Sequence, residues 1–87
     1  MKYAISQVVY FIGSRRGQIL VEPMEITKIE RGINIDQKTH FNMYSGYCPD
    51  DPESIPHTES ESLLFPSYEE AINEIQRQLS VLRAKHD

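Results

Sequence analysis

The sequence lacks the residues from which disulfide frameworks and membrane spans are built. Among its 87 residues there is one cysteine, Cys48, and no tryptophan. A single cysteine excludes an internal disulfide framework and fits a reducing compartment, so a cytoplasmic location is expected. No apolar run approaches the ~20 residues that a transmembrane helix needs. Residues 3–13 are largely apolar, but Ser6 and Gln7 interrupt them and no small-residue cleavage site follows, so we interpret them as a strand rather than as a signal peptide.

The sequence also lacks a recognisable metal-binding or catalytic motif. Its three histidines lie far apart, without cysteine or carboxylate neighbours at ligand spacing: His40, His57 and His86. Cys48 is nine residues from His57, in a stretch that offers no third group to orient a nucleophile. Asp50 and Asp51 stand without the alternating ligands and central glycine of a calcium loop. We therefore expect no metal, no cofactor and no enzymatic activity.

Size and charge set further limits. A chain of this length forms one domain, here residues 1–87, and buries about 60–65% of its unfolded surface. The formal net charge is −4, and the charges are unevenly distributed. Residues 1–47 carry six Lys or Arg against four Asp or Glu, whereas residues 48–87 carry three against nine. An acidic loop is predicted over residues 48–61, where Ile55 is the sole candidate for the core.

The clearest structural signal is a helix over residues 68–85. Ser67 stands at the N-cap position and Glu70 completes a capping box three residues later, while Pro66 discourages an earlier start. Apolar side chains then recur at helical spacing: Ile72, Ile75, Leu79 and Leu82. We predict that residues 68–84 form one continuous helix, which packs on a sheet through the first three of these side chains.

Strands are predicted within residues 3–65, over 7–12, 18–22, 24–30, 39–44 and 62–65. Two glycines make residues 13–17 a turn. Pro23 lacks a ladder donor, which predicts a bend, a bulge or an edge position. The apolar positions of residues 24–30 fall out of phase, which predicts a bulge or a strong twist. The following turn lies either at residues 31–32 or at residues 36–38.

Short strands joined by tight turns, with no helix between them, predict an antiparallel sheet. The expected fold class is α+β: a small antiparallel, SH3-like β-barrel or a curled sheet of 4–5 strands, followed by one C-terminal α-helix. The segment VVYFIGSRRGQILVEPMEITKIERG, followed by FPSYEEAINEI, resembles the small SH3-like (KOW-type) barrel proteins with a C-terminal helix that bacteria and their phages encode. The resemblance covers roughly residues 7–79. It implies a binding platform rather than an enzyme, and several proteins of this kind bind nucleic acid or ribosomal partners.

The acidic half of the chain leads to the first functional hypothesis, a non-enzymatic protein-binding module. Duplex DNA presents one negative charge per ~1.7 Å, and rows of carboxylates imitate that field. The expected partner is therefore a basic, nucleic-acid-binding site on a host protein, and the chain would be an anti-CRISPR-like or other anti-defence inhibitor from a phage or mobile element. Tyrosines at a Ser-Gly turn supply apolar anchors, unless they close the barrel end instead. The predicted partner-binding residues are Tyr44, Tyr47, Asp50, Asp51, Glu53, Glu59, Glu61, Glu69 and Glu74.

The alternative is a nucleic-acid-binding domain, associated with ribosomes or transcription, that uses the basic N-terminal half. Its contact residues would be Arg15, Arg16, Lys28, Arg31 and Lys38. Because the sequence predicts no continuous basic face, direct nucleic-acid binding ranks second. A homodimer is also expected, since Leu79, Val81 and Leu82 extend the apolar stripe of the helix beyond what a small sheet covers.

Overall fold

The computed structural model describes residues 2–51 and 53–86. The strands are β1 (Val8–Arg15), β2 (Gln18–Asn34), β3 (Thr39–Tyr47), β4 (His57–Ser60) and β5 (Leu64–Phe65). A 3-10 turn, η1 (Glu61–Leu63), separates β4 from β5, and the helix α1 (Tyr68–His86) follows. Within these residues the predicted α+β class, five antiparallel strands followed by one helix, is confirmed. None of the described helical residues makes a segment long and apolar enough to cross a membrane.

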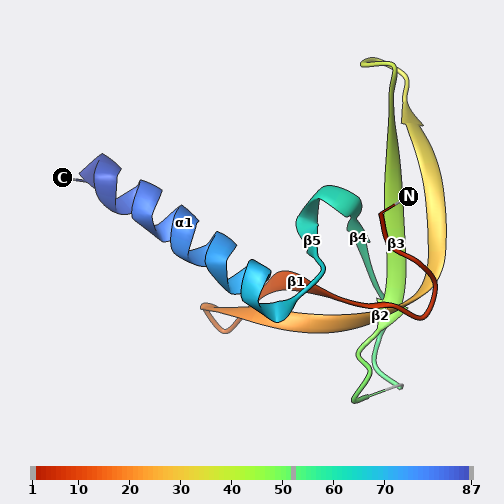
Figure 1. The fold of residues 1–87 in the computed structure, drawn as a ribbon, viewed down its shortest axis with the longest axis horizontal. Helices are drawn as coiled ribbons and strands as arrows, with labels where there is room; N and C mark the ends of the chain where they lie inside the picture. Colours follow the sequence, from red (N-terminus) through yellow and green to blue (C-terminus); the bar gives the residue numbers. More distant parts are fainter. Residues whose placement is uncertain (1, 52, 87) are drawn as a thin grey trace.

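Strand β2 organises the sheet, whose order is β4-β3-β2-β1-β5. Its 17 residues are shared between two partners, because β1 pairs with the first half up to Glu25 and β3 pairs with the second half from Glu25 onward. Figure 1 shows β2 bending where the partners change, so that the two hairpins point in different directions. The sheet is curled rather than closed into a barrel, and β4 and β5 are its edge strands.

The bend falls where the sequence pattern breaks. The pairing register against β3 shifts between Ile26 and Lys28, which confirms the predicted irregularity in residues 24–30. Pro23 lies in the part of β2 that has β1 on one side and no β3 on the other, an edge position of the kind that proline tolerates. The turn after β2 spans residues 35–38, so residues 31–32 continue the strand and the second of the two alternatives is correct.

Strand β4 lies inside the segment that was expected to be an acidic loop over residues 48–61. It pairs with β3 from Ser60 opposite Met43 to His57 opposite Gly46. Its sequence, HTES, has no apolar alternation and therefore no signal for a strand. The strand forms through its backbone pairing with β3 rather than through a buried apolar face. The loop itself is therefore shorter than predicted and covers residues 48–56.

The buried core gathers side chains from both hairpins and from the segment before β1. It comprises Tyr3, Val9, Phe11, Met24, Ile26, Tyr44 and Leu64. Backbone hydrogen bonds tie the first segment to the bend, because the Ser6 N–H donates to the Ile26 carbonyl at 2.7 Å and the Ile26 N–H donates to the Gln7 carbonyl at 3.0 Å. The rings of Tyr3 and Tyr44 make an edge-to-face contact with their centroids 5.4 Å apart. The core thus stabilises the bend itself.

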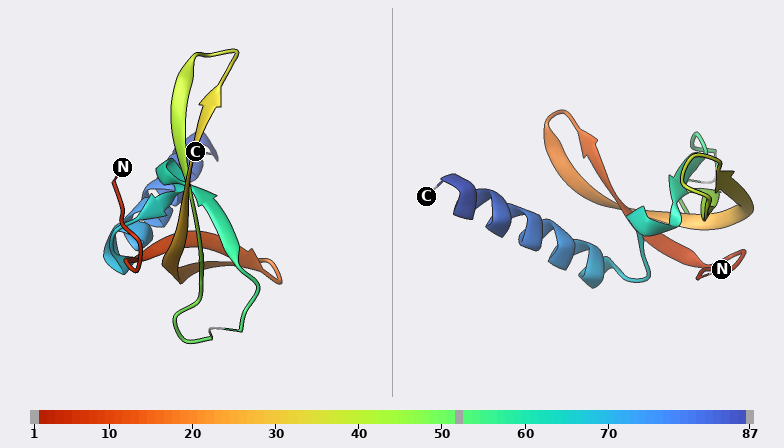
Figure 2. Two further views of the ribbon diagram at one scale, coloured as in Figure 1. Left: turned by 90° about the vertical axis from the view of Figure 1, so that its right-hand side faces the viewer. Right: turned by 90° about the horizontal axis from the view of Figure 1, so that it is seen from above.

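Helix α1 begins where the capping signal predicts. The Glu70 N–H donates to Ser67 Oγ at 3.2 Å, and the helix then continues without interruption. Its packing differs from the prediction. Ala71 is fully buried and the two following isoleucines are half-buried, but Leu79 is 44% exposed. Figures 1 and 2 show the reason, because the helix axis diverges from the sheet and its second half projects away from it.

Candidate functional site

The loop between β3 and β4 is built from two successive turns. The Asp51 N–H donates to the Cys48 carbonyl, and the Ser54 N–H donates to the Asp51 carbonyl, each at 3.0 Å. Prolines in this stretch remove backbone donors and restrict φ, so turns replace regular structure. The two turns leave the carboxylates of Asp50, Asp51 and Glu53 exposed. The loop therefore presents three negative charges within four residues.

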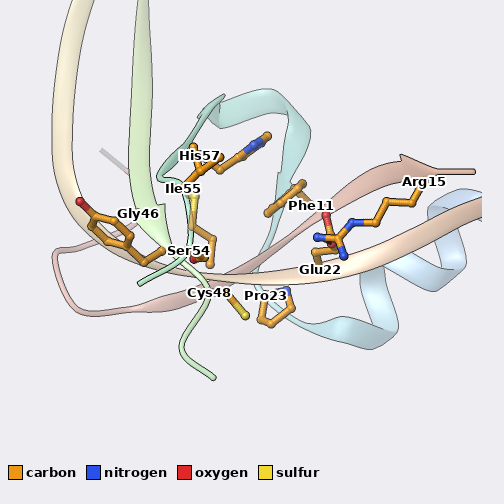
Figure 3. Close-up of a pocket in the computed structure, with 11 residues that line it drawn as sticks. Phe11, Arg15, Glu22, Pro23, Gly46, Cys48, Ser54, Ile55 and His57 are labelled. Atoms are coloured by element: carbon orange, nitrogen blue, oxygen red, sulfur yellow. Dashed lines mark ion pairs between the residues drawn. The ribbon is translucent and has the colours of Figure 1, made fainter. Parts of the chain in front are cut away.

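A cavity of about 180 Å³ lies beside this loop (Figure 3). The loop and its flanks supply one wall, which includes Tyr47, Cys48, Ser54, Ile55 and His57. The first hairpin supplies another, which includes Phe11, Arg15, Glu22 and Pro23. Two of the loop-side residues are apolar and exposed, since Tyr47 is 36% and Ile55 is 90% exposed. The cavity thus joins an apolar rim to the acidic loop.

Polar groups around the cavity are paired with one another. The guanidinium of Arg15 lies 2.9 Å from the Glu22 carboxylate. The ring of His57 stacks on Phe11 with the centroids 3.9 Å apart, and His57 Nε2 lies 2.9 Å from Glu59 Oε2. Glu59 was predicted to contact a partner, but the structure gives it a partner within the chain. The stacking of His57 on Phe11 joins the two walls of the cavity.

The cavity contains Cys48 and His57, the pair considered above as a nucleophile and its base. Figure 3 shows the Cys48 side chain directed toward Pro23 and the His57 ring beside Phe11, so the two groups do not face each other. Activation of a thiol needs a base within hydrogen-bond reach. Among residues 2–51 and 53–86, no three or more His, Cys, Asp or Glu side chains are grouped so as to hold a metal ion.

Tyr44 is predicted to contact a partner, and the structure contradicts this prediction. Its side chain lies in the core and is fully buried. Its hydroxyl donates to Glu61 Oε2 at 2.5 Å and accepts the Tyr3 N–H at 3.3 Å. Glu61 also accepts a hydrogen bond from Asn42 Nδ2 at 3.1 Å. Burial raises the pKa of Tyr44, while the hydrogen bond from Tyr44 lowers the pKa of Glu61. Tyr44 and Glu61 are thus engaged inside the fold rather than in contact with a partner.

The predicted acidic residues on α1 lie outside the loop. Arg77 Nε donates to Glu74 Oε2 at 2.9 Å, and the hydrogen bonds from Arg77 and Gln78 lower the pKa of Glu74 to about 2. Glu69 is exposed on the first turn of the helix. Of the predicted set, the structure brings together the four residues at the β3–β4 loop: Tyr47, Asp50, Asp51 and Glu53.

The basic residues of the alternative hypothesis are dispersed. Besides the pair of Arg15 with Glu22, Lys28 Nζ lies 2.6 Å from Glu30 Oε1. The others are spread along β2 and its two turns: Arg16, Arg31 and Lys38. At about 3.3 Å per residue, a strand of 17 residues separates the two turns by several tens of ångströms along its path. Within the described chain, these residues do not make one continuous basic face.

Sequence reasoning missed Ile55, which it assigned to the core. The structure exposes 90% of this residue at the edge of the cavity. The neighbouring sequence does indicate that Ile55 is exposed. A lone isoleucine among prolines and carboxylates has no apolar neighbours in sequence with which to form a buried stripe. Such a side chain is a candidate for contact with another molecule.

Comparison with known proteins gives no match: no family model, no curated protein and no solved structure is significantly similar to the chain. The resemblance to SH3-like (KOW-type) barrel proteins therefore stays a prediction.

Proposed function

We propose that this chain is a non-enzymatic protein-binding module whose contact surface is the acidic loop surface, defined as Tyr47, Asp50, Asp51, Glu53 and Ile55. The observation that carries the proposal is the combination at one loop of two exposed apolar side chains and three exposed carboxylates, beside a cavity of about 180 Å³. Protein interfaces place apolar anchors at their centre and charges at their rim, and this loop has both parts.

The charge of the loop defines the chemistry of the partner. Asp50, Asp51 and Glu53 repel one another, and none of the described ion pairs involves them. A basic protein surface relieves this repulsion and accelerates association at low salt. A surface of that kind is the nucleic-acid-binding site of a host protein, where the carboxylates take the place of phosphates. On this proposal the chain acts in the cytoplasm as an anti-defence inhibitor from a phage or mobile element, of the anti-CRISPR kind.

A matched pair of variants tests the proposal. The first, Asp50→Asn with Glu53→Gln, removes two of the three negative charges of the loop. The second, Asp36→Asn with Glu30→Gln, makes the same chemical changes on the β2–β3 hairpin and gives the same net charge. Proteins captured by the wild-type chain are compared with those captured by each variant, and affinities are measured at about 50 and about 200 mM salt. We expect the loop variant to lose the basic partner while the hairpin variant retains it.

The same material tests the alternative function. A mobility-shift assay with duplex DNA and with RNA, at about 50 mM salt, measures direct nucleic-acid binding. Micromolar binding that disappears in an Arg16→Ser, Arg31→Ser variant and persists in the loop variant would replace the proposed function with the nucleic-acid one. Retention of every captured protein by the loop variant would also overturn it.

A further inference from the structure

The second half of α1 and the β1–β2 hairpin diverge and leave an apolar groove between them. Figure 2 shows the two elements separating from a common base. The groove has a volume of about 220 Å³, and its apolar lining comprises Ile12, Ile19, Ile75, Leu79 and Leu82. Three of these side chains are about half exposed: Ile19 at 56%, Leu79 at 44% and Leu82 at 52%. A contiguous apolar surface of this kind in a small domain marks a contact with another molecule.

The apolar positions of α1 follow the pattern of a paired helix. Residues 72, 75, 79 and 82 recur at spacings of three, four and three, which is the a/d seam of a heptad. The first turns of this seam rest against the chain's own sheet, whereas Leu79 and Leu82 are each about half exposed. A seam that continues past its own sheet suits a second helix.

The charge pattern of the helix selects the orientation of that second helix. Residues 68–76 contain three glutamates and no cation, whereas residues 77–86 contain Arg77, Arg83 and Lys85 and no carboxylate. Two copies in antiparallel orientation bring the acidic end of each helix beside the basic end of the other, and their macrodipoles also oppose. A parallel pair would bring like charges together.

The geometry points to a second copy of this chain as the occupant of the groove: we propose a twofold dimer in which α1 pairs antiparallel with α1 of the other copy. A twofold axis at position 77 sets position 75 at the height of position 79 of the other copy, and position 72 at the height of position 82. The exposed Leu79 and Leu82 of each helix then extend over the end of the other seam that its own sheet covers in part. The same register brings Glu69 beside position 83 of the other copy, where the sequence has arginine, because both positions directly follow a d position and lie on the same side of the antiparallel pair. Ile12 and Ile19 of each hairpin then cover the helix of the other copy. This inference is independent of the proposed function, because the groove lies outside the acidic loop surface.

The mass in solution is the first measurement. Light scattering at roughly 100 µM, a concentration in the range of weak protein dimers, should give twice the chain mass of 10.1 kDa. Leu79→Ser with Leu82→Ser should return the mass to that of one chain and leave the circular dichroism spectrum unchanged, because both positions are already exposed. Ile33→Ser with Ile35→Ser is the matched control, since it alters two exposed residues on the β2–β3 hairpin and should leave the dimer intact.

A charge exchange tests the orientation of the helices. Glu69→Arg alone and Arg83→Glu alone should each weaken dimerisation about tenfold, because each creates two repulsive pairs in the twofold assembly. The double exchange should restore the wild-type dissociation constant. A wild-type mass of one chain would overturn the dimer. The same mass is expected if the helix instead folds back onto its own hairpin, so that outcome would also count against the proposal. Loss of the dimer in the hairpin control, or a double exchange no tighter than the single variants, would overturn the antiparallel pairing.

Discussion

The bend of the sheet and the three arms that leave it are stabilised in different ways. The arms are the end of the β1–β2 hairpin (residues 13–20), the end of the β2–β3 hairpin (residues 31–41) and the second half of α1 (residues 77–86). All of the buried core residues lie at the bend or in segments packed against it, outside these arms. The arms instead carry exposed apolar side chains such as Ile33, Ile35 and Leu82. The bend therefore determines whether the chain folds, and the arms offer surface to other molecules.

The overall dimensions agree with this division. The radius of gyration is 14.7 Å, compared with about 12 Å for a compact domain of this length. An isolated two-stranded ribbon is marginally stable in water, and from Lys28 to Asn34 strand β2 has β3 as its sole partner in the described sheet. Substitutions at the bend should consequently change the free energy of unfolding far more than equivalent substitutions in the arms.

The largest effect is expected at Gly46, where β3 crosses the bend. A Cβ atom there would lie 1.9 Å from the Glu25 carbonyl oxygen, which is backbone and cannot move without distorting β2. We expect Gly46→Ala to lower the free energy of unfolding by about 3 kcal/mol, measured by urea denaturation.

Gly32 provides the matched control for this substitution, because it lies in the β2–β3 arm. The Cβ of Gly32→Ala would meet the ring of Phe41, which is 43% exposed and can rotate away. This variant should lose less than about 1 kcal/mol. Equal losses at the two glycines would contradict the division between bend and arms.

The second prediction concerns pH and the contact between Tyr44 and Glu61. The pKa of Glu61 is lowered in the folded state, so its contribution to stability is present above the ordinary value of 4.5 and is lost as the pH falls through the folded pKa. The pKa of Tyr44 is raised, so its contribution is present below the ordinary value of 10.0 and is lost as the pH rises through the folded pKa. Wild-type stability should therefore decline at both ends of this range.

The Tyr44→Phe variant distinguishes the effect of this contact on pH-dependent stability from the effects of the other carboxylates. At neutral pH it should cost about 1–3 kcal/mol, because the Tyr3 N–H loses its buried acceptor and Glu61 loses a donor. Between pH values just below 4.5 and neutrality, its unfolding free energy should change less than that of wild type, while the Glu74–Arg77 pair contributes equally to both proteins. Parallel pH profiles for the two proteins would show that the contact is not linked to stability.

Local chemistry predicted the parts of the fold that depend on neighbouring residues. Ser67 and Glu70 located the start of the helix, and the phase slip in residues 24–30 located the bulge, since both signals act within a few residues. Strand β4 could not be predicted, because its polar residues gain order from pairing with β3, which is remote in sequence. The departure of α1 from the sheet was likewise hidden, since the apolar stripe is the same whether its own sheet or another chain covers it.

The sequence predicted that the candidate site is acidic, but it did not predict which residues belong to it. The density of carboxylates after Tyr47 located the acidic segment, yet each carboxylate looks alike in sequence. Which of them are used internally depends on three-dimensional proximity: Glu61 meets Tyr44 from 17 residues away, and Glu59 meets a histidine that stacks on Phe11. Ile55 was misassigned because exposure of an isoleucine is set by the absence of a covering element.

The smallest expected effect lies at the tip of the β1–β2 arm. The two-residue loop between Arg15 and Gln18 has positive φ at both positions, 51° at Arg16 and 78° at Gly17. Glycine adopts this conformation freely, whereas arginine does so with strain, and asparagine is favoured at the first position of such turns. Arg16→Asn should therefore raise the free energy of unfolding by about 0.5 kcal/mol, measured as a higher urea midpoint with an unchanged slope.

Arg15→Asn is the control for this change, because it makes the same substitution one residue earlier, where φ is not positive. It removes the exposed ion pair with Glu22, which is worth less than about 1 kcal/mol, so its stability should equal or fall slightly below that of wild type. If Arg16→Asn is no more stable than Arg15→Asn, the turn is not strained. If it adds more than about 2 kcal/mol, the hairpin tip is coupled to the core more strongly than a projecting arm allows. The sign and the small size of this effect together test whether the arm is independent of the bend.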